Sequence, residues 1–170
     1  MSAHVDICMR PIAVVRSPWK EASGVPVNVR EARGARGTVV VRRRYVRGLK
    51  DLGGFDRIWL LFWFNRARRG ALIVKPFISK VPRGVFATRA PSRPNPIGMS
   101  CVRLRRIAGN VLHVEDLDLL DGTPVLDIKP YQPSDRFIGC RFGWMDKVRG
   151  RLPRADERFV RRSCRKGIKR

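Results

Sequence analysis

The stretch Gly84-Val-Phe-Ala-Thr-Arg-Ala-Pro-Ser-Arg-Pro-Asn-Pro-Ile-Gly-Met-Ser100 runs directly into an alternating apolar and basic run, Ser100-Cys-Val-Arg-Leu-Arg-Arg-Ile107. Each of its three prolines, Pro91, Pro94 and Pro96, fixes its own φ and pushes the preceding residue into an extended conformation. The stretch therefore cannot be a helix, and it loses little entropy when it is held in one shape. We expect a short strand at its start, then a braced loop, then a second strand with one face in water.

The braced loop displays three polar side chains, those of Arg89, Arg93 and Asn95. A rigid polar loop between two strands is how a scaffold presents a binding site. The same residues also fit a loop that only connects two strands. Such a loop carries arginines because the whole chain is rich in them. The residue pattern leaves both interpretations open.

The rest of the chain repeats short apolar runs that are separated by turns, without a long helical period. The most apolar of them is Ile58-Trp-Leu-Leu-Phe-Trp-Phe64, whose length suits a buried strand better than a helix. Other strands are expected within residues 11–15, 38–45, 72–77, 111–115 and 124–128. Seven or eight such strands indicate a mainly β, single-domain protein, an antiparallel barrel or sandwich with few short helices.

The chain is strongly basic. Lys and Arg number 37 against 14 Asp and Glu, which gives a formal net charge of +23 over 170 residues. Such an excess repels itself in a compact protein unless an anionic partner absorbs it, and nucleic acid is the obvious partner. A general arginine bias of the source proteome explains the same numbers. An anionic membrane surface is the weaker option, because no basic amphipathic helix stands out.

Four cysteines, Cys8, Cys101, Cys140 and Cys164, lie far apart, and only two histidines accompany them. A zinc site needs clustered ligands, so we expect no metal. Cys101 falls in a strand pattern and is expected to be a small buried residue. No signal peptide and no apolar run of membrane-spanning length is evident, so we expect a reduced, cytoplasmic protein with no membrane partner.

Four blocks of the sequence, taken in order, resemble the TsaA-like, or TrmO, family. They are Val14-Val-Arg-Ser-Pro-Trp-Lys20, Gly48-Leu-Lys-Asp-Leu-Gly-Gly-Phe-Asp-Arg-Ile-Trp-Leu-Leu-Phe-Trp-Phe64, the run from Ala87 to Ser100, and Leu117-Asp-Leu-Leu-Asp-Gly-Thr-Pro-Val-Leu-Asp-Ile-Lys-Pro-Tyr131. Members of this family are S-adenosylmethionine-dependent methyltransferases that act on a modified adenosine in the anticodon loop of tRNA. The resemblance covers most of residues 10–147 and favours the barrel over the sandwich.

The resemblance implies S-adenosyl-L-methionine as cofactor, tRNA as partner, and the N6 of a threonylcarbamoyl-type adenosine as methyl acceptor. It also implies a homodimer with cofactor pockets near the interface. The length matches the short members of the family, with a barrel domain at 8–147 and a basic C-terminal tail at 148–170. Two other functions stay open: a methyltransferase for another small molecule, and a non-catalytic module that holds nucleic acid or a nucleotide.

The family's cofactor contacts can be transferred onto matching positions of this chain. They are Pro26, Val27, Asn28, Asn65, Arg66, Arg89, Met99, Glu115, Asp116, Leu117 and Asp118. Two of these segments depart from the family pattern, which usually has Pro-Arg-Gln at 26–28 and His-Gln at 65–66. Both departures fall at the expected pocket, so we expect the cofactor affinity or the accepted substrate to differ.

Acidic residues gather in one segment of this basic chain. Methyl transfer from a sulfonium donor mainly needs alignment and exclusion of water, so no acid–base pair is demanded and the catalytic residues stay unknown. Asp118 is a weak candidate for the group that removes a proton from the attacking nitrogen. Asp121 precedes a glycine and is expected to be a turn residue. For Asp127 two interpretations stay open: a carboxylate of the site, or a partner of a nearby arginine.

Five arginines are candidates for contact with nucleic acid: Arg42, Arg43, Arg44, Arg47 and Arg93. The first four are expected on both faces of a strand that ends near residue 45, with some side chains beside the proline loop, where phosphates would neutralise them.

A splayed base needs an aromatic partner, and Trp63, Phe64 and Tyr131 are candidates. Successive residues of a strand face opposite ways, so at least one of Trp63 and Phe64 is expected in the core.

The last thirty residues carry twelve basic and three acidic side chains. From Arg161 onward the chain has almost nothing to bury, so we expect no stable structure there. Such an arm engages phosphates without reading sequence, or else only aids solubility. If it engages phosphates, deleting residues 161–170 lowers tRNA affinity and flattens its salt dependence, while cofactor affinity stays unchanged.

Overall fold

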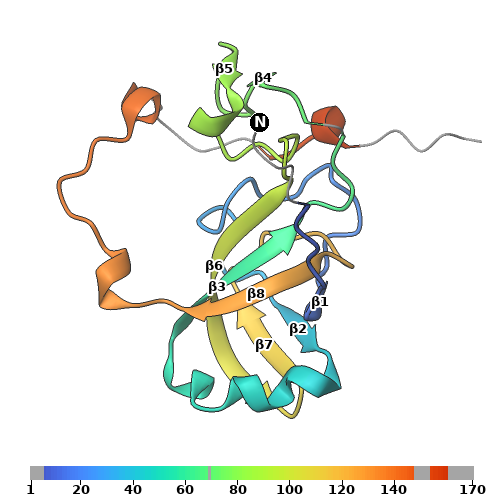
Figure 1. The fold of residues 1–170 in the computed structure, drawn as a ribbon. Helices are drawn as coiled ribbons and strands as arrows, with labels where there is room; N and C mark the ends of the chain where they lie inside the picture. The colour runs from blue at the N-terminus through green and yellow to red at the C-terminus, as the bar shows by residue number, and fades with distance from the viewer. Residues whose placement is uncertain (1–5, 69, 148–153, 161–170) are drawn as a thin grey trace, which may run out of the picture.

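The computed structural model describes residues 6–68, 70–147 and 154–160. It is built around a closed antiparallel barrel (Figure 1) in which the strands follow the order β1-β2-β7-β6-β3-β8. The strands are β1 (Ala13–Arg16), β2 (Gly37–Val41), β3 (Arg57–Trp63), β6 (Ile97–Ala108), β7 (Val111–Glu115) and β8 (Pro124–Pro130). The predicted mainly β fold, closed as a barrel, is confirmed.

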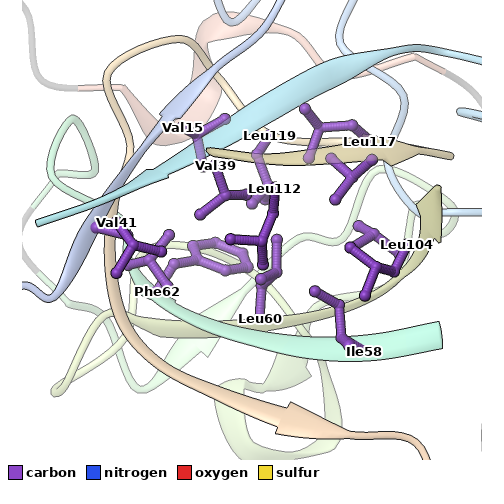
Figure 2. Close-up of a cluster of buried hydrophobic side chains, with 14 of the residues drawn as sticks. Val15, Val39, Val41, Ile58, Leu60, Phe62, Leu104, Leu112, Leu117 and Leu119 are labelled. Carbon is purple, nitrogen blue, oxygen red and sulfur yellow. The ribbon is translucent and has the colours of Figure 1, made fainter. Parts of the chain in front are cut away.

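Alternation along the strands fills the barrel with aliphatic side chains (Figure 2). In β3, Ile58, Leu60 and Phe62 are at most 2% exposed, and the residues between them face outward and are partly exposed. This is the pattern of a strand with one face on the core, rather than one buried on both faces. Branched aliphatic residues of the other strands complete the interior, as they do in small barrels.

A second, smaller sheet lies outside the barrel, where β4 (Ile73–Val74) pairs with β5 (Arg83–Gly84). Both strands are shorter than expected. The strand predicted over 72–77 stops at Val74, and the one predicted at the start of the proline stretch gives way to a 3-10 helix, η3 (Val85–Ala87). Pro76 and Pro82 lack the backbone N–H that a longer ladder needs, which limits both strands.

The strand predicted to reach residue 45 is also shorter, because β2 ends at Val41. Asn110 closes the ladder there: its backbone carbonyl accepts the Val41 N–H at 2.8 Å, and its side-chain amide donates to the Val41 carbonyl at 2.7 Å. The next residues form a 3-10 helix, η1 (Arg43–Leu49). This helix lies beside the β6–β7 turn, at the opposite end of the barrel from η3 (Figure 1). The prediction that its arginines emerge beside the proline loop is therefore wrong.

The remaining described elements are short. They are the 3-10 helices η2 (Leu52–Gly54), η4 (Pro133–Asp135), η5 (Gly143–Lys147) and η6 (Glu157–Phe159). Within the described ranges, no helix is long and apolar enough to cross a membrane. Residues 148–153 and 161–170 of the expected tail lie outside the described residues, but Arg154–Val160 packs against the loops at one end of the barrel rather than extending away.

Candidate active site

The proline loop is held rigid by its own polar groups. Arg93 Nη1 donates to the carbonyls of Thr88 at 2.9 Å, Ala90 at 3.3 Å and Val85 at 3.4 Å. The Thr88 hydroxyl also donates to the Val85 carbonyl, at 2.9 Å. One nitrogen of Arg93, which we expected to contact nucleic acid, is thus used inside the loop. The Arg89 side chain is exposed beside it.

A neighbouring segment approaches the loop so closely that it needs glycine. A Cβ atom on Gly70 would overlap the backbone of Arg93. Because that obstacle is backbone, no side-chain rotation relieves it. The segment after β3 and the proline loop are therefore fixed against each other.

The acidic segment after β7 divides into residues with different roles. Glu115 pairs with Arg36 at 3.1 Å and with Arg105 at 3.5 Å. The Leu117 side chain is fully buried in the core, and its carbonyl accepts the indole N–H of Trp19 at 2.8 Å. Both residues are committed to holding loops in place.

Asp116 anchors the backbone. Its φ of 62° places it in the left-handed region, and its carboxylate accepts the Gly34 N–H at 3.0 Å and the Arg57 guanidinium at 2.7 Å. Burial on its own would raise the pKa of Asp116, but these hydrogen bonds and the nearby arginine charge hold it below its ordinary value. Each of its two carboxylate oxygens already accepts one of these donors.

Asp118 is the exception in this segment. Its Oδ1 is buried and has no hydrogen-bond partner among the described residues. Burial raises the pKa of Asp118 to about 6, and the Ser100 hydroxyl and the Arg89 charge only partly oppose that rise. The structure therefore brings together Asp118, Ser100 and Arg89. An unsatisfied buried carboxylate oxygen is a ready acceptor for a ligand's N–H or O–H.

The segment Pro26–Asn28 borders the same end of the barrel. Pro26 is buried, and Val27 and Asn28 are partly exposed. The Asn28 side chain accepts the Glu31 N–H at 3.1 Å, and its carbonyl accepts the Ala32 N–H at 3.1 Å. The asparagine that departs from the family pattern thus closes a turn of its own loop.

Asn65 and Arg66 follow β3 and are both exposed. Arg66 Nη1 donates to the Lys20 carbonyl at 2.7 Å, which ties the end of β3 to the loop after β1. Met99 is 46% exposed and lies on the outer face of β6, whereas its neighbour Ser100 faces the interior at 4% exposed. The side chain of Met99 is therefore on the other face of the strand from the Ser100–Asp118 contact.

Asp121 has the structural role that was predicted for it. Its carboxylate accepts the Ser17 N–H at 3.0 Å and pairs with Lys20 at 2.9 Å. The Lys20 contact, followed by the Ser17 hydrogen bond, lowers the pKa of Asp121. Asp127 pairs at 2.8 Å with Lys129, a lysine instead of the expected arginine.

The three aromatic residues that were candidates for stacking on a base lie in different parts of the barrel. Phe64 packs edge-on against Phe62, with ring centroids 5.0 Å apart, so it belongs to the core as one of the pair was expected to. The rings of Tyr131 and Trp59 have centroids 6.1 Å apart. This pair lies near the start of β3, away from the proline loop. Trp63 lies at the end of β3 nearest that loop and is partly exposed.

Cys101 is partly exposed on the outer face of β6, although the sequence predicted a buried residue. Burial of its thiol still raises the pKa of Cys101, against the opposing charge of Arg57. No group of three or more metal-ligating side chains occurs in the part of the chain that the structure describes.

Sequence reasoning missed Ser100 as a site residue. It was seen only as the junction between the proline loop and the next strand. The available signal was its polarity at an inward position of an alternating strand, where Val102 and Leu104 are the next inward residues. A polar side chain at a core position needs a partner, and here that partner is Asp118.

The family model described as the tRNA-methyltransferase O N-terminal domain matches residues 14–135. The chain belongs to the TrmO family. A probable S-adenosyl-L-methionine-binding protein of Pyrococcus abyssi is 47% identical over 156 residues, which are 90% of this chain and 85% of that one. The tRNA (adenine(37)-N6)-methyltransferase of Escherichia coli is 41% identical over 135 residues, 72% of this chain and 56% of that enzyme.

Solved TrmO structures have the same fold. The crystal structure of TrmO from Pseudomonas aeruginosa superposes with a TM-score of 0.73 at 38% identity, over 86% of this chain and 66% of that one. This chain thus spans less than two thirds of both the Escherichia coli enzyme and that crystal structure. Its residues after 135 lie beyond the TrmO family match.

The raised pKa of Asp118 predicts how stability depends on pH. In the folded protein Asp118 binds its proton more tightly than in the unfolded chain, so stability falls as pH rises from about 4 to about 6. Asp118→Asn removes that penalty. We expect the variant to be more stable than the parent by roughly 2–3 kcal/mol at pH 8, with the difference vanishing below pH 4.

Urea unfolding of both proteins at pH 4, 6 and 8 measures this difference. Asp127→Asn is the matched control, because its carboxylate is exposed and already paired with Lys129. A pH-independent difference between Asp118→Asn and the parent contradicts the burial of this charge.

Proposed function

We propose that this chain is an S-adenosyl-L-methionine-dependent methyltransferase that methylates the N6 of a threonylcarbamoyl-type adenosine next to the tRNA anticodon. The single observation that carries the proposal is Asp118, a buried carboxylate with an unpaired oxygen beside Arg89 in a TrmO-family barrel. The names of the relatives support the cofactor and the reaction class. The threonylcarbamoyl group rests on the resemblance of the signature residues.

The residues present fit the cofactor. A sulfonium cofactor with a ribose, an adenine and an amino-acid group needs hydrogen-bond acceptors, a cation and apolar walls. Asp118 Oδ1 is an acceptor without a hydrogen-bond partner, and the exposed Arg89 is a cation for the amino-acid carboxylate of the cofactor. Pro26 and Val27 supply apolar surface at the same end of the barrel. When bound, the cofactor supplies an electrophilic methyl group.

Asp118 is placed to accept a proton. As the adenine N6 forms its bond to the methyl carbon it must lose a hydrogen, and a neighbouring carboxylate takes it up. A pKa of about 6 leaves Asp118 mainly ionised at neutral pH, yet more basic than an ordinary aspartate. Ser100 and Arg89 orient the carboxylate through the contacts described above.

Nucleoside mass spectrometry tests the function. Unmodified or hypomodified tRNA is incubated with the protein and cofactor carrying a labelled methyl group, and we expect label in an N6-methylated adenosine derivative. Tight cofactor binding with no label in tRNA supports a methyltransferase for another small molecule. Cofactor-independent binding of RNA without transfer supports the non-catalytic module.

Two variants test the cofactor cation and the proton acceptor in that assay. Arg89→Ala should weaken cofactor affinity about tenfold by calorimetry, because it removes a cation from the site. Asp118→Asn should lower kcat by a factor on the order of 10². In the parent protein, kcat should decline as pH falls below about 6, because Asp118 becomes protonated. The Asp127→Asn control should match the parent in both measurements.

The basic residues of η1 form a second candidate surface for RNA. Arg42, Arg43, Arg44 and Arg47 are all exposed, and no described ion pair uses any of them. They lie at the far end of the barrel from η3 (Figure 1), so they cannot touch the nucleotide that Asp118 touches. We propose that they bind backbone phosphates in a more distant part of the tRNA.

The double variant Arg43→Ala with Arg47→Ala tests this surface. We expect KM for whole tRNA to rise several-fold, and the slope of log KM against log salt to flatten by about 1–2, because two phosphate contacts are lost. A short anticodon stem-loop should be methylated equally well by variant and parent. The double variant Arg136→Ala with Arg141→Ala removes the same charge elsewhere, and an equal effect from that control contradicts a specific surface.

We also propose that the protein is a cytoplasmic homodimer. Large apolar side chains lie exposed around the small sheet and the segment after β8, including Phe86 at 78%, Ile138 at 84% and Phe142 at 69%. Exposed apolar surface on this scale usually marks an interface. Light scattering at micromolar concentration should give twice the chain mass, and Phe142→Asp should shift it toward the monomer. A monomeric parent protein contradicts the proposal.

A further inference from the structure

The segment Arg154–Val160, here called the C-terminal strap, lies outside the residues that the family model matches. Although the sequence analysis assigned it to the basic tail, it contacts three loops at the end of the barrel that carries Asp118. Figure 1 shows its helix η6 at that end, beside β4 and β5. Each of the three contacts falls next to a segment that was expected to bind cofactor.

The first contact is with the loop that carries Pro26–Asn28. The Ala155 N–H donates to the Val25 carbonyl at 2.8 Å, and the Ala155 carbonyl accepts the Gly24 N–H at 3.0 Å. Pro26 forms an antiparallel bridge with Arg154, whose guanidinium also donates to the Gly24 carbonyl at 2.8 Å. The strap thus extends this loop as a short strand would.

The second contact is with the segment after β3, directly beyond Arg66. The Arg68 N–H donates to the Phe159 carbonyl at 2.7 Å, and Arg68 Nε donates to the Val160 carbonyl at 2.7 Å. Ala67 forms an antiparallel bridge with Val160. Backbone bonds therefore fix the position of this segment as well.

The third contact is with the proline loop. Phe159 is 9% exposed and packs with Val74, Val85 and Ala90, and Phe77 meets its ring edge-on at 5.2 Å. Ala90 directly follows Arg89, and Val85 begins η3. Burying an aromatic ring against both ends of this short run restricts how far Arg89 can move.

From these contacts we infer that the C-terminal strap is a positioning element of the cofactor site. Phe159 and Ala155 are its positioning residues; they add to the direct contacts among three loops, which also meet through the Arg66–Lys20 hydrogen bond and the approach of Gly70 to Arg93. Irregular loops hold a small ligand tightly only when their arrangement is fixed before binding, because ordering them on binding costs affinity. The inference rests on the proposed function, since it assumes S-adenosyl-L-methionine as the ligand.

On its other side, the proline loop is contacted by Trp144 of η5. The Trp144 indole N–H donates to the Ala87 carbonyl at 2.8 Å, and the Arg83 guanidinium lies 5.0 Å over the Trp144 ring. The loop that carries Arg89 is therefore held between η5 and the strap. Trp144 and Phe159, which make these two contacts, both lie after residue 135.

Calorimetric titration of the full-length protein with S-adenosyl-L-methionine tests the strap without requiring activity. We expect Phe159→Ala to weaken binding about tenfold or more, because the loops must then be ordered by the ligand. Phe159→Leu, which keeps an apolar side chain, should restore most of the affinity. Ala155→Pro removes the N–H that bonds Val25 and also restricts the backbone of residues 154 and 155, so it should weaken binding several-fold.

Leu52→Ala is the matched control. Leu52 is also 9% exposed, but it lies in η2 at the other end of the barrel, so its truncation should lower the melting temperature and leave cofactor affinity unchanged. All titrations are done at 25 °C on proteins whose near-ultraviolet circular dichroism matches the parent.

Two outcomes overturn the inference while the proposed function stands, and a third overturns both. If the parent binds the cofactor and folded Phe159→Ala binds it equally well, the strap only contributes stability. If Phe159→Ala binds more tightly, the strap obstructs the site instead of ordering it. If the parent itself does not bind the cofactor, the proposed function fails first and the inference fails with it.

Discussion

The arrangement depends on strand β6, which hydrogen-bonds to β3 over its first half and to β7 over its second. No other described strand is as long, and its register places Ser100 opposite Leu60, facing the interior. Because β6 begins where the proline loop ends, the same strand fixes the loop that carries Arg89. Because it also pairs with β7, it sets where the acidic segment leaves the barrel. The Ser100–Asp118 contact is a consequence of that double pairing.

Two aspartates two residues apart show how local packing decides acidity. Asp116 and Asp118 both lose water on folding, and burial raises the pKa of each. Asp116 recovers the cost through the Gly34 N–H and the Arg57 guanidinium, so its pKa ends below the ordinary value. At Asp118 the Ser100 hydroxyl, the backbone N–H of Asp118 itself and the Arg89 charge do not offset the effect of burial, so its pKa stays high. At Asp116 the direct donors outweigh the effect of burial on the pKa, whereas at Asp118 the effect of burial outweighs its hydrogen bonds.

The barrel was predictable because its signals are local. Alternation along β3 and β6, and the prolines between residues 91 and 96, each restrict the backbone in a way that a single segment reveals. The end of β2 was not predictable in the same way. Nothing in residues 42–45 says that Asn110, about seventy residues later, closes the ladder at Val41. Contacts of that kind depend on tertiary structure that sequence patterns do not encode.

The site was predictable only in part, for a similar reason. The resemblance placed Arg89 and Asp118 in one site, and the structure brings them into electrostatic contact. The resemblance could not show that Glu115 and Asp116 form ion pairs with arginine side chains, or that Ser100 faces Asp118. Side-chain partners of this kind depend on strand register. Nor could the resemblance assign Phe159 a role, since a lone aromatic in a basic tail carries no periodic signal. Its partners Val74, Val85 and Ala90 lie in segments far earlier in the chain.

In a chain with a net charge of +23, an aspartate without a cationic partner is unusual. In a field this positive, an aspartate that is reachable by a flexible Lys or Arg should be paired, and Glu115, Asp116 and Asp121 are. Asp118 is the contrast, because its Oδ1 is buried without a hydrogen-bond partner among the described residues. The raised pKa of Asp118 therefore comes from burial that its hydrogen bonds and the nearby Arg89 charge do not offset, and this is what makes it the most basic carboxylate of the site.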